Sequence, residues 1–251
     1  MYNLFCGNTE AAAIFHSIAC RLVMMLGGHL EPAYREPPPG MEDSWSTKRY
    51  FRRLFWLCYM YDKDISLRAG HHPVIDDEQC DLTLPPGYKQ IDSFDDFKDN
   101  DDLFPGDMRL SIIKSKMIKS LYSINAVQKS DAELLRDIRE LDDELERWRT
   151  SISPHYRPTL APPYHIQISG TANKPKKIHV IVIHLEYYSL MAMIHNASGW
   201  CRAWVHQEVD QIAEVTSSQA LALQASRSTL VNLCTVNNVL NCGDFWYVSN
   251  Q

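Results

Sequence analysis

The sequence lacks the features that mark several broad classes of protein. Its 25 lysines and arginines are outnumbered by 31 aspartates and glutamates, for a net charge of −6, so the chain has no overall cationic surface to hold a phosphate backbone. No apolar run reaches the roughly 20 residues of a membrane-spanning helix. The first 25 residues lack the basic region of a secretory signal, and Glu10 and Arg21 interrupt their apolar stretch. We expect no membrane partner, and DNA contact only through a separate module.

Paired cysteines and the common catalytic motifs are also missing. The seven cysteines are scattered along the chain and none forms C-x-x-C, a pattern typical of free thiols in a reducing compartment. No H-E-x-x-H or G-x-S-x-G motif occurs. With 251 residues, 45% of them hydrophobic, the chain can bury a core without disulfides or metal. We therefore expect no catalytic residue, no metal site and no cofactor, and one large domain or two small ones.

What the sequence does contain is apolar periodicity of the helical kind. Helices are predicted over residues 8–26, 46–68, 108–127, 130–148, 178–197, 204–212 and 218–240. In the first of these, the apolar positions at helical spacing are Ala11, Ile14, Phe15, Ile18, Leu22 and Met25. In the third, Lys114 is expected on the exposed side. In the fourth, Ser130 and Glu133 are expected to form a capping box. After it, apolar residues recur at spacings of four and three, which predicts a face packed against a partner helix: Leu134, Ile138, Leu141, Leu145 and Trp148. Because no hairpin or internal repeat is visible, the predicted fold is an all-α helical bundle.

Two stretches interrupt the helices. Residues 76–107 contain eleven acidic residues against two lysines, and we interpret them as a long, exposed or partly mobile acidic loop. Residues 151–177 carry five prolines and are predicted to form a proline-rich linker, because proline cannot continue a helix.

One segment is specific enough to suggest a family. It reads RRLFWLCYMYDKDISLRAG over residues 52–70, followed by HHPVIDD at 71–77 and Leu-Pro at 84–85. The segment resembles the central motif of the regulatory, or middle homology, domain of fungal zinc binuclear cluster transcription factors. Leu26 to His29 and the tyrosine-rich helix around Tyr187 agree with this family. Because the family domain begins with helices upstream of residue 8, the resemblance implies that residues 1–251 are part of such a domain.

The resemblance also implies a function. Members of this family regulate transcription in the nucleus and read DNA through a separate N-terminal cluster of six cysteines holding two zinc ions. None of the seven cysteines here has that spacing, so zinc is expected only in a module outside this chain. The implied role is that of a regulatory, effector-sensing domain. The implied partners are a small-molecule effector, transcriptional co-regulator proteins and a second copy of the chain.

The motif supplies the candidate site. Arg53, Trp56, Tyr59 and Asp62 follow one another at a spacing of three, which places a guanidinium, an indole, a phenol and a carboxylate along one helix face. The full set of candidate motif or ligand-binding residues is Arg53, Phe55, Trp56, Tyr59, Asp62, Gly70, Pro73, Asp76 and Pro85. Such a row can line a pocket. The alternative is that these residues brace helix packing and anchor the loop that follows.

Three other hypotheses stay open. Asp95-Asp96-Phe97-Lys98-Asp99 resembles the D-D-x-x-D magnesium motif of terpene cyclases, which would make the chain an enzyme. A helical scaffold whose acidic loop docks a basic partner is another alternative. A polar loop cluster could also ligate a metal ion, and its members are His71, His72, Asp76, Asp77 and Cys80.

Overall fold

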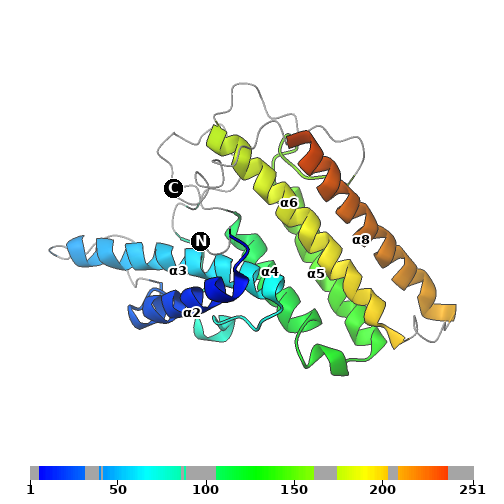
Figure 1. Cartoon of the computed structure of the whole chain (residues 1–251), viewed down its shortest axis with the longest axis horizontal. Coiled ribbons are helices and arrows are strands. Elements are labelled where there is room, and N and C mark those ends of the chain that lie inside the picture. Colours follow the sequence, from blue (N-terminus) through cyan, green and yellow to red (C-terminus); the bar gives the residue numbers. More distant parts are fainter. Residues whose placement is uncertain are drawn as a thin grey trace. The chain divides into compact units, whose positions relative to one another are not determined.

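The protein is all-α in the computed structural model, which describes residues 6–31, 40, 42–85, 88, 106–160, 174–202 and 209–236. Its α-helices are α2 (Thr9–Met25), α3 (Glu42–Ala69), α4 (Met108–Leu121), α5 (Asp131–Ser151), α6 (Lys174–Asn196) and α8 (Val209–Val236). Short 3₁₀ helices are η1 (Asp77–Gln79), η3 (Ala126–Gln128) and η4 (Ala197–Trp200). The described residues contain no strand, which confirms the predicted fold class. The chain divides into two compact units, residues 1–89 and residues 90–251 (Figure 1).

In the first unit, α2 and α3 form an antiparallel helix pair (Figure 1). α2 ends in a Schellman motif: Gly27 has a φ of +76°, and the Gly28 amide donates to the Val23 carbonyl at 3.0 Å. A Cβ atom on Gly28 would lie 2.6 Å from the carbonyl oxygen of Phe51. Position 28 therefore has to be glycine for the chain to approach α3 this closely, and that approach brings residues 29–31 over α3.

The large apolar row of α2 does not face α3. Ile14 is 63% exposed and Met25 is 76% exposed, and the same is true of the rest of the row, with Phe15, Ile18 and Leu22 all more than half exposed. α2 instead buries Ala12, Cys20 and Val23. The sequence predicts the row but not its direction, because small residues such as Ala12 and Cys20 let the two helices approach more closely than phenylalanine or methionine would.

In the second unit, α6 lies along α8 and α4 lies along α5 (Figure 1). The predicted four-three repeat of α5 is confirmed as its buried face, with Leu134, Ile138, Leu141, Leu145 and Trp148 all in the core. The predicted capping box of Ser130 and Glu133 is also present. A buried aspartate, Asp107, caps α4 and accepts a hydrogen bond from the Trp148 indole at 2.9 Å, so the start of α4 is tied to the end of α5.

Several predicted boundaries and one predicted exposure are wrong. α3 begins four residues earlier than predicted, α6 also begins four residues earlier, and α4 ends at Leu121. The predicted break between the helices at 204–212 and 218–240 is absent, because α8 runs without interruption from Val209 to Val236, through Ser217 and Ser218. Residues 204–208 and 237–240 of these two predictions lie outside the described residues. Lys114 is buried rather than exposed, since its ammonium lies 2.7 Å from the Glu186 carboxylate.

The two predicted loops fall partly outside the described residues. Of the acidic stretch, residues 76–85, 88, 106 and 107 are described, and of the proline-rich stretch, residues 151–160 and the first residues of α6. Residues 95–99, which carry the D-D-x-x-D pattern, lie outside them.

Within the part of the chain that the structure describes, one helix is long and apolar enough to cross a membrane by length and composition alone. It covers Ile178–Trp200, and 67% of its apolar window is buried within the described structure, the environment of a core helix. The prediction that no apolar stretch is long enough to span a membrane is therefore wrong. His184, Glu186 and His195 interrupt the run of apolar letters without making the stretch as a whole polar.

Candidate functional site

Asp62 of the motif lies buried in α3 and faces the loop after it. Its Oδ1 accepts the Val74 amide at 2.9 Å, and its Oδ2 accepts the Ile75 amide at 3.0 Å. These two bonds fix the start of the loop against the helix. Buried backbone amides need such partners, because leaving one unpaired costs about 1–3 kcal/mol.

Lys63 completes this buried polar group. Its ammonium donates to the Ile75 carbonyl at 2.6 Å and lies 3.3 Å from Asp62 Oδ2 and 3.5 Å from Asp77 Oδ1. It also lies 4.6 Å from the centre of the Tyr59 ring, while the Tyr59 hydroxyl donates to Asp77 at 3.0 Å. Tyr59, Asp62 and Lys63 thus hold both the backbone of the loop and the first residue of η1.

The buried arginine of the motif is Arg52, and Arg53 is only half-buried. Arg52 is 2% exposed, and its guanidinium donates to the Glu31 carboxylate at 2.9 Å. It also donates to three carbonyl oxygens: His29 at 3.3 Å, Asp81 at 2.6 Å and Thr83 at 2.7 Å. Burial lowers the pKa of Arg52, which the Glu31 and Asp81 carboxylates partly counteract.

This geometry corrects the predicted row. A spacing of three from Trp56 leads back to Arg53, whereas a spacing of four leads to Arg52, and both positions neighbour Trp56 on a helix. The spacing from Trp56 alone therefore does not show which of the two arginines is the buried one. A signal for Arg52 was its alignment with Tyr59 and Lys63, seven and eleven residues further along the same helix stripe.

Aromatic rings pack beneath the arginine. Phe55, Trp56 and Tyr59 are fully buried, with ring centres 5.5 to 5.9 Å apart. The Arg52 guanidinium lies 5.1 Å from the Phe55 ring centre and 5.4 Å from that of Trp56. Trp56 and Tyr59 lie on one helix face, as their spacing of three predicts, and desolvation strengthens the cation–π contacts.

The remaining predicted residues shape the turn and loop. Gly70 has a φ of +67° and ends α3 in a second Schellman arrangement, in which the His71 amide donates to the Ser66 carbonyl. Pro73 is half-buried in the loop. Asp76 caps η1 by accepting the Glu78 amide at 3.1 Å. Pro85 accepts the Tyr88 amide through its carbonyl at 2.9 Å.

Together these contacts favour the bracing interpretation of the motif. The side chains of Arg52, Tyr59, Asp62 and Lys63 all bind the chain itself, mostly backbone groups of residues 29–31 and 74–83. What the arrangement does chemically is hold an irregular loop in one conformation, because each buried charge is paired and each loop amide it touches is satisfied.

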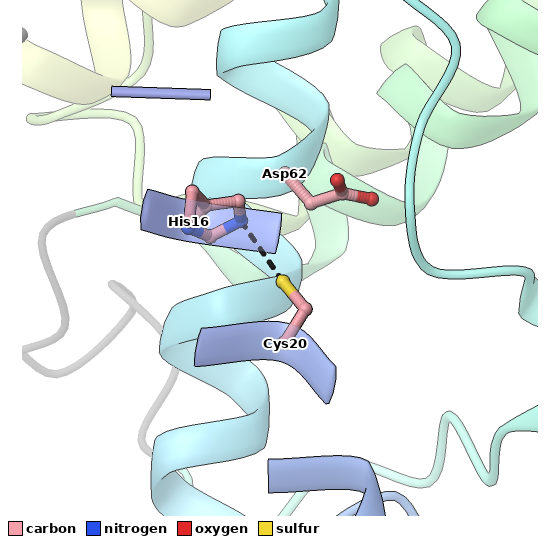
Figure 2. Close-up of side chains that lie close together, drawn as sticks. All are labelled: His16, Cys20 and Asp62. Carbon is pink, nitrogen blue, oxygen red and sulfur yellow. Dashed lines mark hydrogen bonds between the residues drawn. The ribbon is translucent and has the colours of Figure 1, made fainter. Parts of the chain in front are cut away.

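The predicted metal cluster of the loop is not assembled. His71 and His72 are exposed, Asp76 is engaged as a cap, and Asp77 binds Tyr59 and Lys63. Among the described residues, the group close enough to share an ion is instead His16, Cys20 and Asp62 (Figure 2). Sequence reasoning missed it because its members come from two helices.

A serine, a histidine and an aspartate also line up in the second unit. Ser218 Oγ lies 3.1 Å from His195 Nδ1, and Asp142 Oδ1 lies 3.4 Å from His195 Nε2. The order of groups resembles a hydrolase triad. Ser218, however, is 8% exposed and lies within helix α8, so its hydroxyl is buried between helices. We interpret this chain of contacts as a polar link between α5, α6 and α8.

The chain belongs to the fungal-specific transcription factor domain family, whose model matches residues 1–150. Among characterised relatives, it is 40% identical over 151 residues to the ABC-transporter-regulating transcription factors of Aspergillus oryzae and of Aspergillus fumigatus. These matches cover 59% of this chain and 16% of each relative.

A more distant relative extends the similarity toward the C-terminus. An uncharacterized transcriptional regulatory protein of Schizosaccharomyces pombe is 25% identical over 208 residues, covering 76% of this chain and 32% of the relative. The chain thus spans at most about a third of the length of these relatives. No solved structure matches it significantly.

Proposed function

We propose that the chain is a regulatory domain that controls a fungal transcription factor through protein contacts made by the exposed apolar face of α2. We define this face by Ile14, Phe15, Ile18, Leu22 and Met25. In this proposal DNA is bound by another module of the factor, and the site of action is the nucleus. The family and the transcription-factor relatives support both points.

The observation that carries the proposal is the contrast between the motif and the α2 face. The polar side chains of the motif bind the protein's own loop, whereas the α2 face presents large apolar side chains to solvent, each more than half exposed. Contiguous exposed apolar patches mark interaction sites. A protein surface therefore fits the described structure better than a ligand pocket in the motif.

The proposed occupant is an apolar helix of the same transcription factor, from a segment outside this chain. The relatives are much longer than the matched region, so such segments exist in them. Two helices pack by interlocking ridges of apolar side chains, and a 17-residue helix such as α2 presents a row of the right kind. One helix face is small compared with the roughly 800 Å² per partner of a stable dimer interface, which favours a contact within one protein.

Reporter assays with the full transcription factor test this proposal. The double variant Phe15→Glu/Leu22→Glu should change reporter transcription several-fold, because two charges cannot be buried in an apolar contact. The isolated chain should keep its melting temperature, since exposed substitutions change the free energy of unfolding by about 0.5 kcal/mol or less. Arg21→Glu, an exposed position on α2 outside the face, is the matched control and should leave transcription unchanged.

Two results would overturn the proposal. One is unchanged transcription from a double variant that accumulates to normal levels. The other is light scattering that shows a dimer of the isolated chain, abolished by the double variant, since the α2 face would then bind a second copy. A small-molecule effector is a further part of the proposed function. It would act by favouring one arrangement of α2 and its partner, and a thermal-shift screen of metabolites would reveal it.

A further inference from the structure

The antiparallel packing of α2 on α3 brings together four residues whose side chains can ligate a metal ion. His16 and Cys20 are one turn apart on α2, and Cys58 and Asp62 are one turn apart on α3. Cys20 Sγ lies 3.2 Å from His16 Nε2. One ligand atom from each of His16, Cys20 and Asp62 lies within 4.8 Å of the others (Figure 2), and the Cys20 and Cys58 thiols share a hydrogen bond.

We propose that His16, Cys20, Cys58 and Asp62 bind a Zn²⁺ ion between α2 and α3. Two thiolates, an imidazole and a carboxylate are all zinc ligands, and four ligands complete its tetrahedral coordination. Zinc bonds of about 2.3 Å to sulfur and 2.0–2.1 Å to nitrogen place those two atoms about 3.5 Å apart. His16 and Cys20 therefore need to separate by only a few tenths of an ångström.

The surroundings suit the ion electrostatically. Binding releases the protons of Cys20 and Cys58 to solvent, while His16 binds as the neutral imidazole. The Lys63 ammonium lies 3.3 Å from Asp62. The positive charges of the Zn²⁺ ion and this ammonium together equal the negative charges of two thiolates and one carboxylate.

Asp62 and His16 are also held in place by outer contacts, as metal ligands commonly are. The Val74 and Ile75 amides fix the Asp62 carboxylate, and the backbone of Cys58 hydrogen-bonds to the His16 ring. The site departs from the sequence expectation of no metal in this chain. H-x-x-x-C on one helix and C-x-x-x-D on another form no contiguous motif, so the ligand set emerges only when the helices pair.

Metal titration of the whole 251-residue chain, reduced and stripped with a chelator, tests the site. Zn²⁺ should bind at one ion per chain with a Kd below about 1 µM and should raise the melting temperature. Co²⁺, used as a spectroscopic probe, should give tetrahedral visible bands and thiolate-to-metal charge-transfer absorption. Calorimetry in buffers of different ionisation enthalpy should report proton release on Zn²⁺ binding.

Single variants assign the ligands. Cys20→Ser and Cys58→Ser should each weaken Zn²⁺ binding by at least about 100-fold, because losing a ligand costs more than the ~10–100-fold of losing an outer contact. Cys234→Ser, which alters an exposed thiol of α8, should bind as the parent chain does. Asp62 is left intact because the loop depends on it, and circular dichroism checks that each variant folds.

The absence of saturable Zn²⁺ binding by the parent chain would overturn the proposal. So would a Co²⁺ spectrum without thiolate absorption, or equal affinity in the parent, Cys20→Ser and Cys58→Ser chains. A Cys20–Cys58 disulfide that persists in mass spectra of the reduced and stripped chain would also overturn it. None of these results bears on the α2 face, so this inference and the proposed function can fail separately.

Discussion

The two units of the chain are stabilised in different ways. In the first, the buried polar groups Arg52, Asp62 and Lys63 bind loop backbone on either side of α3. In the second, rows of apolar side chains such as Leu145 and Trp148 fill the core, and buried polar contacts such as Lys114 with Glu186 join one helix to another rather than a helix to a loop. Buried charge is costly unless paired and hydrogen-bonded, whereas apolar packing tolerates exchange of similar residues.

This difference explains why the family motif lies in the first unit. A guanidinium that reaches three carbonyls and a carboxylate cannot be replaced by another residue type, so the sequence there is distinctive. The apolar rows of α5 or α6 can be built from many combinations of leucine, isoleucine and valine. The contrast predicts that single polar substitutions damage the first unit more than they would damage the second.

The largest effect is expected for Asp62→Ala. It would leave the Lys63 ammonium buried without its nearest carboxylate and two loop amides without acceptors. Removing one partner of a buried ion pair costs about 3–5 kcal/mol, and urea unfolding should show a loss of this size. Hydrogen exchange should show lost protection at the Val74 and Ile75 amides.

Asp43→Ala is the matched control for that substitution, because Asp43 is exposed on the same helix. It should change the free energy of unfolding by no more than about 0.5 kcal/mol. If the two variants unfold alike, the polar group around Asp62 does not stabilise the first unit, and the contrast between the units is wrong.

A smaller effect is expected for Arg52→Lys. Lysine keeps the charge but cannot reach the Glu31 carboxylate and the carbonyls of Asp81 and Thr83 together, because it has a single ammonium in place of a planar fork. We expect a loss of about 2 kcal/mol in urea unfolding. Arg53→Lys is the control at the half-buried neighbouring position and should cost much less. Equal losses would mean that the two arginines share the clamp.

Features that depend on local sequence pattern could be predicted, whereas features that depend on contacts between distant segments could not. The helices, the α5 core face and the capping box depend on local periodicity and were predicted. The position of Trp56, Tyr59 and Asp62 along one helix face was also predicted, but the burial of Arg52 rather than Arg53 depends on loop carbonyls up to 31 residues away. Likewise, the direction of the α2 face depends on how α2 pairs with α3, and so does the cluster of His16, Cys20 and Asp62. The pattern within either helix alone does not encode this pairing.

The smallest expected effect concerns pH and the second unit. Burial lowers the pKa of His184 below its usual 6.5, although a hydrogen bond with the Tyr156 carbonyl at 2.8 Å counteracts part of this. As pH falls through 6.5, the unfolded chain takes up a proton on this residue before the folded chain does, so the stability present above pH 6.5 is lost progressively below it. Glutamine in His184→Gln retains a donor for the Tyr156 carbonyl but does not titrate. The melting temperature of this variant should decline less than that of the parent between pH 7 and pH 5, which bracket the usual imidazole pKa of about 6.5. Identical pH profiles of the parent and the variant would mean that His184 does not cause the loss of stability at low pH.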